Sequence, residues 1–100
     1  MAKKAKTAAE RRHHGLIAQM PCVLCDLLGQ PQATHTTVHH IREGQGMAQR
    51  ASHWLAIPLC RDCHQGDLGI HGDRTLLRIA NVNELDLLAL TIERVFGRAA

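Results

Sequence analysis

The stretch that decides the fold is "LAIPLCRDCH", residues 55–64. It joins a short apolar segment to a C-x-x-C pair, Cys60 and Cys63, and a histidine follows directly. A second C-x-x-C pair, Cys22 and Cys25, lies far upstream. Each pair offers two thiolates on a tight turn, an arrangement that chelates tetrahedral zinc. The four cysteines therefore predict one structural zinc site that ties two distant segments together.

The composition favours a small domain that needs such a site. The chain has 100 residues, enough for one domain with a modest core. Its aromatic residues are Trp54 and Phe96 alone, and it has 8 glycines. Small domains with thin cores usually depend on a metal or on disulfides.

The expected compartment favours a metal over disulfides. No segment approaches the roughly 18 apolar residues that a membrane span needs. The basic start continues into "TAAERRHH" rather than an apolar run, which argues against a signal peptide. We therefore expect a cytoplasmic protein, in which cysteines are more often metal ligands than disulfides. A redox role for C-x-x-C is the alternative, and the presence of two pairs weakens it.

Basic residues are unevenly distributed along the chain. The net charge is +3, with a basic cluster near the N-terminus made of Lys3, Lys4, Lys6, Arg11 and Arg12. Such a cluster can engage phosphates, or it can simply be a solvated surface. We expect residues 1–6 to be a flexible basic tail and residues 7–100 to form one domain.

The local patterns predict a mixture of helices and strands. Thr7 and Glu10 have capping-box spacing, so a helix is expected from about Ala8 to Gln19. "CVLCDLLGQPQ" reads as a tight turn that carries two cysteines. Strands are expected over residues 33–41 and 55–60, because these segments are rich in β-branched or apolar residues. "RDCHQGD" is expected to start a helix or a helical turn, and residues 44–53 a loop.

Two helices are expected to close the chain. Asp73 can cap the first, over residues 74–80, and Asn83 the second, over residues 84–96. The second helix carries a hydrophobic stripe that we expect to pack in the core or against a partner: Leu85, Leu88, Ile92 and Phe96.

The histidines need a separate explanation once zinc is assigned to the cysteines. His39 and His40 are adjacent on an expected strand, where successive side chains point to opposite faces. Their rings can converge on one site if the strand ends or bends there. His64 directly follows Cys63, and His71 lies further along. Neutral imidazole binds transition metals and can act as a general base. By contrast, His13 and His14 are interpreted as surface or satisfied core residues.

The order C-x-x-C, "HHI" and "PLC-x-x-CH" resembles the HNH endonucleases, which have a zinc-bound ββα-metal core. The match spans residues 22–71 and is most similar to small phage-encoded HNH proteins of the recombination-enhancement type, which cut DNA together with a recombinase. The resemblance implies an α+β fold. Its ββα-metal core over residues 22–71 would be held by the four-cysteine zinc site, between an N-terminal helix and C-terminal helices at about 73–97.

The resemblance also implies roles for the histidines. His39 stands at the position of an Asp or His metal ligand, and His40 at that of the general base. His64 stands at the closing histidine, a ligand of one catalytic divalent metal, and His71 is a further ligand. The ion can be Mg, Mn, Ni or Zn, and imidazole favours the later metals over Mg.

One position departs from the family pattern. The family often has Asn about nine residues before the closing histidine, where this chain has Leu55. The side chain of Leu55 cannot form a hydrogen bond. His53 or Ser52 is expected to orient His40 instead, or a backbone carbonyl can do so.

These expectations combine into a metal-dependent endonuclease that hydrolyses DNA phosphodiester bonds. The resemblance implies that it is encoded by a phage or prophage and acts in the cytoplasm of a bacterial host, with a recombinase or another phage DNA-processing protein as partner. Arg42, Arg50 and Arg61 are expected to hold flanking phosphates. Two alternatives remain: a zinc-held module that binds nucleic acid without cutting it, and a purely structural phage accessory protein.

Overall fold

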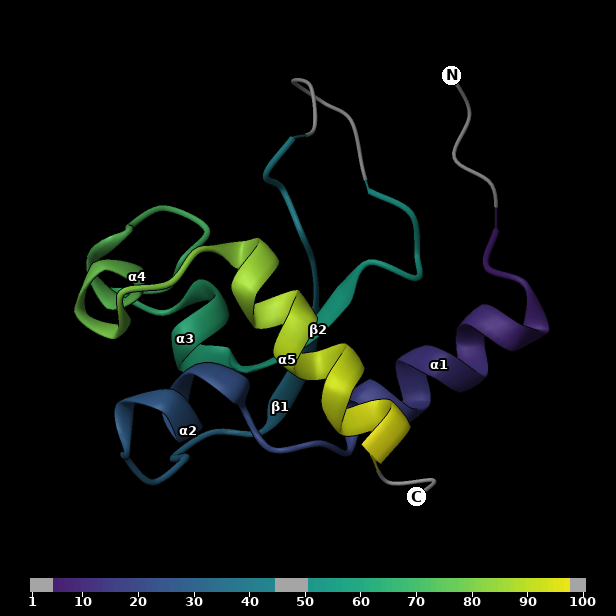
Figure 1. The fold of residues 1–100 in the computed structure, drawn as a ribbon, viewed down its shortest axis with the longest axis horizontal. Coiled ribbons are helices and arrows are strands. Elements are labelled where there is room, and N and C mark those ends of the chain that lie inside the picture. Colours follow the sequence, from purple (N-terminus) through teal and green to yellow (C-terminus); the bar gives the residue numbers. More distant parts are fainter. Residues whose placement is uncertain (1–4, 45–50, 98–100) are drawn as a thin grey trace.

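The computed structural model describes residues 5–44 and 51–97. Within them the chain forms a small α+β fold, as expected, whose elements are α1 (Ala8–Ala18), α2 (Val23–Leu28), β1 (Thr36–His40), β2 (Ala56–Cys60), α3 (Arg61–Gln65), α4 (Thr75–Ala80) and α5 (Glu84–Gly97) (Figure 1). None of these helices is long and apolar enough to cross a membrane. Arg50 and most of the expected basic tail lie outside the described residues.

The centre of the fold is a two-stranded antiparallel sheet. β1 pairs with β2 in a register that sets His40 opposite Ala56 and Thr36 opposite Cys60. All five residues of β2 are buried. A sheet of two strands is not stable alone in water, so the helices must cover it. α1 contacts both strands, α2 and α5 contact β2, and α5 crosses in front of the sheet in Figure 1.

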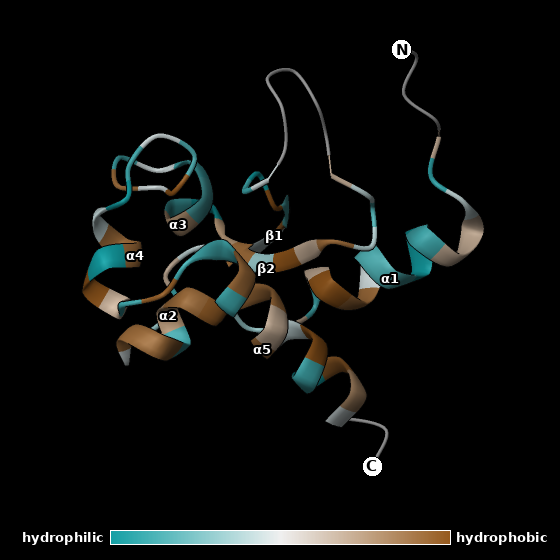
Figure 2. Cartoon of the chain, turned by 45° about the horizontal axis from the view of Figure 1, so that its top comes forward, coloured by the Kyte–Doolittle hydropathy of each residue, from teal (hydrophilic) through white to brown (hydrophobic). Residues whose placement is uncertain are grey.

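The expected capping box starts α1. The backbone N–H of Glu10 donates to Thr7 Oγ1 at 3.1 Å, and that of Thr7 donates to Glu10 Oε1 at 2.8 Å. The middle of α1 is hydrophilic and its C-terminal turn hydrophobic (Figure 2). Its buried residues are His14 and Ile17. A histidine therefore lies where α1 packs on the strands.

The expectation of a tight turn at the first cysteine pair was wrong. Cys22 is the N-cap of α2, and the N–H of Cys25 donates to its Sγ at 3.4 Å. Val23 and Leu24 are fully buried, and a helical turn lets both apolar side chains reach the core. Gly29 ends the helix in the left-handed conformation, with a φ of 68°.

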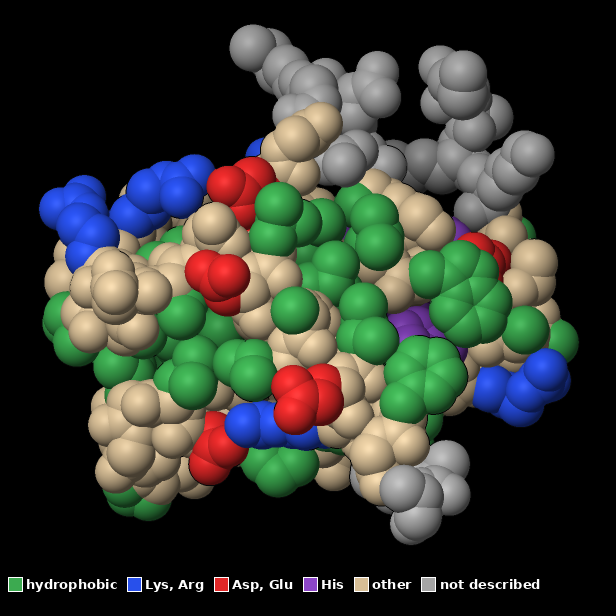
Figure 3. Space-filling model, viewed as in Figure 1, with side chains coloured by type: hydrophobic (Ala, Val, Ile, Leu, Met, Phe, Trp, Pro, Cys, Tyr) green, Lys and Arg blue, Asp and Glu red, His purple; other side chains and the backbone are tan. Residues whose placement is uncertain are grey.

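The expected hydrophobic stripe of α5 is only partly in the core. Of its members Leu88 is buried, whereas Leu85, Ile92 and Phe96 are exposed, and hydrophobic side chains gather over α5 on the face shown in Figure 3. The buried side of α5 instead contains Glu84, Leu87, Leu88 and Thr91. Leu87 and Leu88 on this side pack in the core, and Glu84 on the same side reaches a histidine, as described below.

Of the two expected caps, Asn83 caps α5, whereas the N-cap of α4 is Arg74 and makes no side-chain capping bond. Thr75 N–H donates to Asp73 Oδ1 at 2.7 Å at the start of α4. Asn83 Oδ1 accepts from the N–H of Asp86 at 2.9 Å, and Asp86 Oδ2 accepts from the N–H of Asn83 at 2.9 Å. These reciprocal bonds satisfy backbone donors at the start of α5.

A compact turn follows α3 and brings His71 back to His64. The N–H of Ile70 donates to the Cys63 carbonyl at 2.9 Å, and that of His71 to the His64 carbonyl at 3.3 Å. His71 is therefore placed by a turn and not by two further turns of helix. A Cβ at Gly69 would lie 2.7–2.8 Å from backbone atoms of this turn, so only glycine fits there.

Replacing Gly69 with alanine should destabilise the fold. The added methyl would force backbone apart, which costs about 1–3 kcal/mol in comparable overpacked positions. Gly72→Ala is the matched control, because a Cβ there meets nothing within 4 Å. Urea unfolding of the metal-loaded variants measures the difference. Equal midpoints for the two variants would contradict the close approach at Gly69.

Candidate functional site

The four cysteines form one buried cluster, which we call the cysteine cluster. Their sulfur atoms all lie within 4.8 Å of one another. Cys25 Sγ is 3.7 Å from both Cys60 Sγ and Cys63 Sγ, and no two cysteines form a disulfide. The ligands come from α2 and its cap and from the junction of β2 with α3. The expected convergence of the two C-x-x-C pairs is confirmed, and the cluster can hold a metal.

The thiol pKa values indicate that the cysteine cluster can carry several thiolates only with a bound cation. A hydrogen bond from Cys63 lowers the pKa of Cys22 to about 5. Burial raises the pKa of Cys25 to about 11, and the hydrogen bond to Cys22 raises that of Cys63. Cys22 therefore loses its proton easily, whereas burial and the neighbouring thiolate oppose the deprotonation of Cys25 and Cys63. A bound cation is the group that lets several buried thiolates coexist, so the donor set fits a metal.

A second cluster, the His39 cluster, contains His39, His64 and His71. One ring nitrogen from each lies within 4.8 Å of the others. The ring centroids of His39 are 4.8 Å from His64 and 5.1 Å from His71, and those of His64 and His71 are 4.6 Å apart. β1, α3 and the turn after α3 each contribute one ring. The structure thus brings together the three histidines expected to bind the catalytic metal.

Hydrogen bonds aim two nitrogens of this cluster inward. His39 Nε2 lies 2.5 Å from Glu84 Oε2, so it donates to the carboxylate, and the buried Nδ1 of His39 has no hydrogen-bond partner. The Thr37 hydroxyl donates to the Leu59 carbonyl, so it accepts from His64 Nδ1 at 2.8 Å. The lone pair of His64 is then on Nε2. Two lone pairs in fixed orientations are what a metal requires.

The third ring completes the set. His71 Nε2 lies 2.8 Å from His64 Nε2, and because His64 Nε2 carries the lone pair, His71 Nε2 donates to it. Burial, followed by the charges of neighbouring histidines, lowers the pKa of His64 to about 4. Burial also lowers the pKa of His71, as does the charge of Arg42. Both rings are therefore neutral near pH 7, which is the form that binds metal.

Glu84 is a site residue that sequence reasoning missed. It is 7% exposed, and its carboxylate also accepts from the N–H groups of Arg42 at 3.1 Å and Glu43 at 2.9 Å. Burial acts to raise its pKa, but these bonds and His39 outweigh burial and leave the pKa lowered. In the sequence Glu84 is an ordinary acidic residue in the first turn of a helix, so no local signal pointed to it.

His40 belongs to a separate cluster. His40 Nε2 lies 3.0 Å from His53 Nδ1, as expected if His53 stands in for the missing asparagine. Ser52 instead accepts from the N–H of Trp54, at 3.2 Å. Leu55 is partly buried and packs against the core. Of the alternatives considered for orienting His40, the structure places His53 in contact.

His14 joins His40 and His53, and we call these three residues the His40 cluster. One ring nitrogen from each lies within 4.8 Å of the others. His14 Nε2 lies 2.5 Å from the His53 carbonyl, and its Nδ1 lies 3.2 Å from Lys6 Nζ. His14 is a buried residue with hydrogen bonds, which is one of the two interpretations that the sequence allowed. Its position beside His40 was not predicted.

Strand geometry separates the two histidine clusters. His39 and His40 are successive residues of β1, so their side chains leave opposite faces. Each therefore joins a different group of rings. The charge of His40 still contributes to lowering the pKa of His64, so the clusters lie within electrostatic reach. A charged ligand between them would interact with both.

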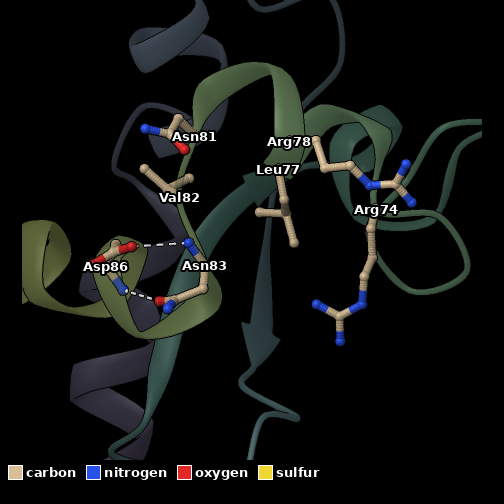
Figure 4. A pocket seen from close by; sticks show the side chains of 7 residues that line it. All are labelled: Arg74, Leu77, Arg78, Asn81, Val82, Asn83 and Asp86. Atoms are coloured by element: carbon tan, nitrogen blue, oxygen red, sulfur yellow. Dashed lines mark hydrogen bonds between the residues drawn. The ribbon is translucent and has the colours of Figure 1, made fainter.

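Arg42 lies near His71 of the His39 cluster. Arg42 and Arg61 are exposed, and the effect of Arg42 on His71 shows that it is close enough to act on an anion there. Arg74 and Arg78 line a separate pocket of about 330 Å³ between α4 and α5, and Figure 4 shows them across it from Asn83 and Asp86. That pocket contains neither histidines nor cysteines, so the clusters are the better candidate site.

The comparisons with known proteins agree with this picture. A family model described as recombination enhancement, RecA-dependent nuclease matches residues 6–94. No match was found among curated proteins or solved structures. The matched stretch contains Glu84, the cysteine cluster and both histidine clusters. The chain therefore belongs to the family of RecA-dependent nucleases of recombination enhancement.

Proposed function

We propose that this protein is a metal-dependent endonuclease of the HNH type that hydrolyses DNA phosphodiester bonds. The observation that carries the proposal is the buried, unpartnered Nδ1 of His39, held by Glu84 and directed toward two further neutral imidazoles. An unsatisfied buried nitrogen is costly unless it has a ligand. A divalent ion held by His39, His64 and His71 would satisfy it.

The order of the elements supports the HNH assignment. β1, β2 and α3 follow one another, and the two strands pair directly. We propose that this ββα unit, within residues 22–71, is the metal-binding core. Zinc in the cysteine cluster would tie α2 to the β2–α3 junction, and α1, α4 and α5 would flank the core.

The His39 cluster suits phosphoryl chemistry. An imidazole that coordinates a metal carries no charge, so a bound ion would keep its full charge for an anionic substrate. Mg, Mn, Ni and Zn are candidates, and imidazole ligands favour the later metals. A bound ion would supply Lewis-acid stabilisation of the charge that develops on the phosphate. Glu84 holds His39 in the tautomer that presents Nδ1.

His40 is the proposed general base. It removes a proton from a water molecule whose oxygen bonds to phosphorus, while the bond from phosphorus to the leaving sugar oxygen breaks and that oxygen is protonated by solvent. His53 Nδ1 contacts the ring and limits its rotation. Arg42, Arg50 and Arg61 would bind flanking phosphates, where guanidinium groups form paired hydrogen bonds.

The family description points to the setting. A RecA-dependent nuclease in recombination acts on DNA. We propose that this chain cuts DNA together with a RecA-type recombinase, is encoded by a phage or prophage, and works in the cytoplasm of the bacterial host. The partly buried Leu55, in place of a polar residue, favours a second candidate: a module that binds nucleic acid without cutting it.

Removing metal from the cysteine cluster should unfold the domain. Structural zinc sites contribute about 10–16 kcal/mol of binding energy, which is as large as the entire stability of most domains. Elemental analysis should find zinc in the purified protein, and a chelator titration followed by far-UV circular dichroism should show loss of helix. A metal-free protein that stays folded would rule out the structural zinc.

Glu84→Gln should weaken metal binding at the His39 cluster. Substitutions of carboxylates that orient metal-binding histidines typically cost 10–100-fold in affinity. Manganese titration followed by calorimetry measures this affinity, while zinc in the cysteine cluster should be unchanged. Glu93→Gln, an exposed change on the same helix, is the control. Equal affinities for the two variants would show that Glu84 does not orient a ligand.

His40→Ala and His64→Ala should fail in different ways. Loss of a general base costs roughly 10²–10⁴-fold in rate, so His40→Ala should cut slowly with its metal still bound. His64→Ala should bind the catalytic metal weakly, and added metal should partly restore cleavage. The exposed His35→Ala is the control.

The assay reads nicking of supercoiled plasmid and cleavage of DNA that carries RecA filaments. If His40→Ala cuts at the wild-type rate, the proposed base is wrong. If no variant, including the wild type, cuts either substrate while DNA binding is retained, the binding module takes the place of the nuclease.

A further inference from the structure

We propose that the His40 cluster is a second transition-metal site, and that an ion bound there inhibits the nuclease. The site would take Zn²⁺, Ni²⁺ or a similar imidazole-binding ion, and not Mg²⁺, which prefers oxygen ligands. The inhibitory effect rests on the proposed role of His40 as base. The binding of metal does not depend on it.

Three separate segments build the site. His14 comes from α1, His40 from the last position of β1, and His53 from the segment before β2. Their ring nitrogens lie within 4.8 Å of one another, the same limit that defines the cysteine cluster and the His39 cluster. His14 is buried and the other two are partly buried. A bound ion would therefore have side chains behind it and an open side toward solvent.

The bonds of His14 prepare it to be a ligand. The Lys6 ammonium can only donate, so Nδ1 of His14 accepts and Nε2 carries the proton that the His53 carbonyl receives. Metal-binding histidines commonly donate their second N–H to a backbone carbonyl, which fixes the ring. The remaining lone pair, on Nδ1, accepts from the Lys6 ammonium.

Lys6 is then a competitor for the site. Its side chain is exposed, and its ammonium lies 3.2 Å from His14 Nδ1. It opposes a metal ion by occupying the lone pair and by like charge. The site would consequently fill only at higher metal concentration than the His39 cluster, whose ligands have a carboxylate partner instead of a competing cation.

The consequence for catalysis follows from the lone pair of His40. A base must keep that lone pair free for the proton of the attacking water. Coordination of His40 to an ion ties up the lone pair and leaves the water without an acceptor. Zinc or nickel should therefore activate the enzyme when the His39 cluster fills and inhibit it when the His40 cluster fills.

The test is a zinc titration of the full chain. Equilibrium dialysis with elemental analysis should find three zinc ions per wild-type chain at saturation, one for each cluster. His14→Ala should bind two, Lys6→Ala should fill the third site at lower zinc, and the exposed His35→Ala should match wild type. A wild type that stops at two ions, or a His14→Ala variant that keeps the third, would overturn the site.

The same variants test inhibition. Cleavage by wild type should rise and then fall as zinc increases, the fall should move to lower zinc in Lys6→Ala, and it should be absent in His14→Ala. Inhibition that persists in His14→Ala would overturn the regulatory role. If nothing cleaves at any zinc concentration, the proposed nuclease fails, while the dialysis still decides whether the metal site exists. Circular dichroism of His14→Ala confirms that the variant is folded.

Discussion

The cysteine cluster is the constraint on which the rest of the structure depends. It joins α2 to the end of β2 and the start of α3, segments that are far apart in the sequence. Because Cys63 is fixed there, the next residue, His64, has a fixed position too. The turn after α3 bonds back to Cys63 and His64 and delivers His71. Two of the three rings in the His39 cluster are thus placed by backbone that the cysteines hold.

The different proposed roles of His39 and His40 follow from the pleat of β1. Adjacent residues of β1 must face opposite sides, so His39 enters a buried cluster with a carboxylate and His40 enters a more open one. Burial suits a ligand that must stay neutral and fixed. Partial exposure suits a base that must meet water. One dipeptide can in this way supply both proposed functions without the two rings competing for one partner.

The charges of the two clusters also differ. Glu84 gives the His39 cluster a buried negative partner, whereas Lys6 gives the His40 cluster a positive neighbour. A divalent cation should therefore prefer the first, and an anionic phosphate should be drawn toward the second.

The first and last helix starts could be predicted from the sequence, because caps are local. Thr7 with Glu10 and Asn83 with Asp86 form hydrogen bonds between residues that are three positions apart. The orientation of α5 could not be predicted: its periodic stripe indicated Ile92 and Phe96 as core residues, but the helix instead buries Glu84, Leu87, Leu88 and Thr91. The helix over the first cysteine pair was missed because a short apolar run has no clear period.

By itself, the sequence determined which residues can chelate: two C-x-x-C pairs, the "HH" pair and the histidine after the last cysteine. The spacing of such ligands along the chain can be recognised from the sequence alone. Only the tertiary structure decided which histidine rings lie together in each cluster. Glu84 is 45 residues from His39 and His14 is 39 residues from His53, and contacts at that separation depend on how helices pack on the sheet, which no local pattern encodes.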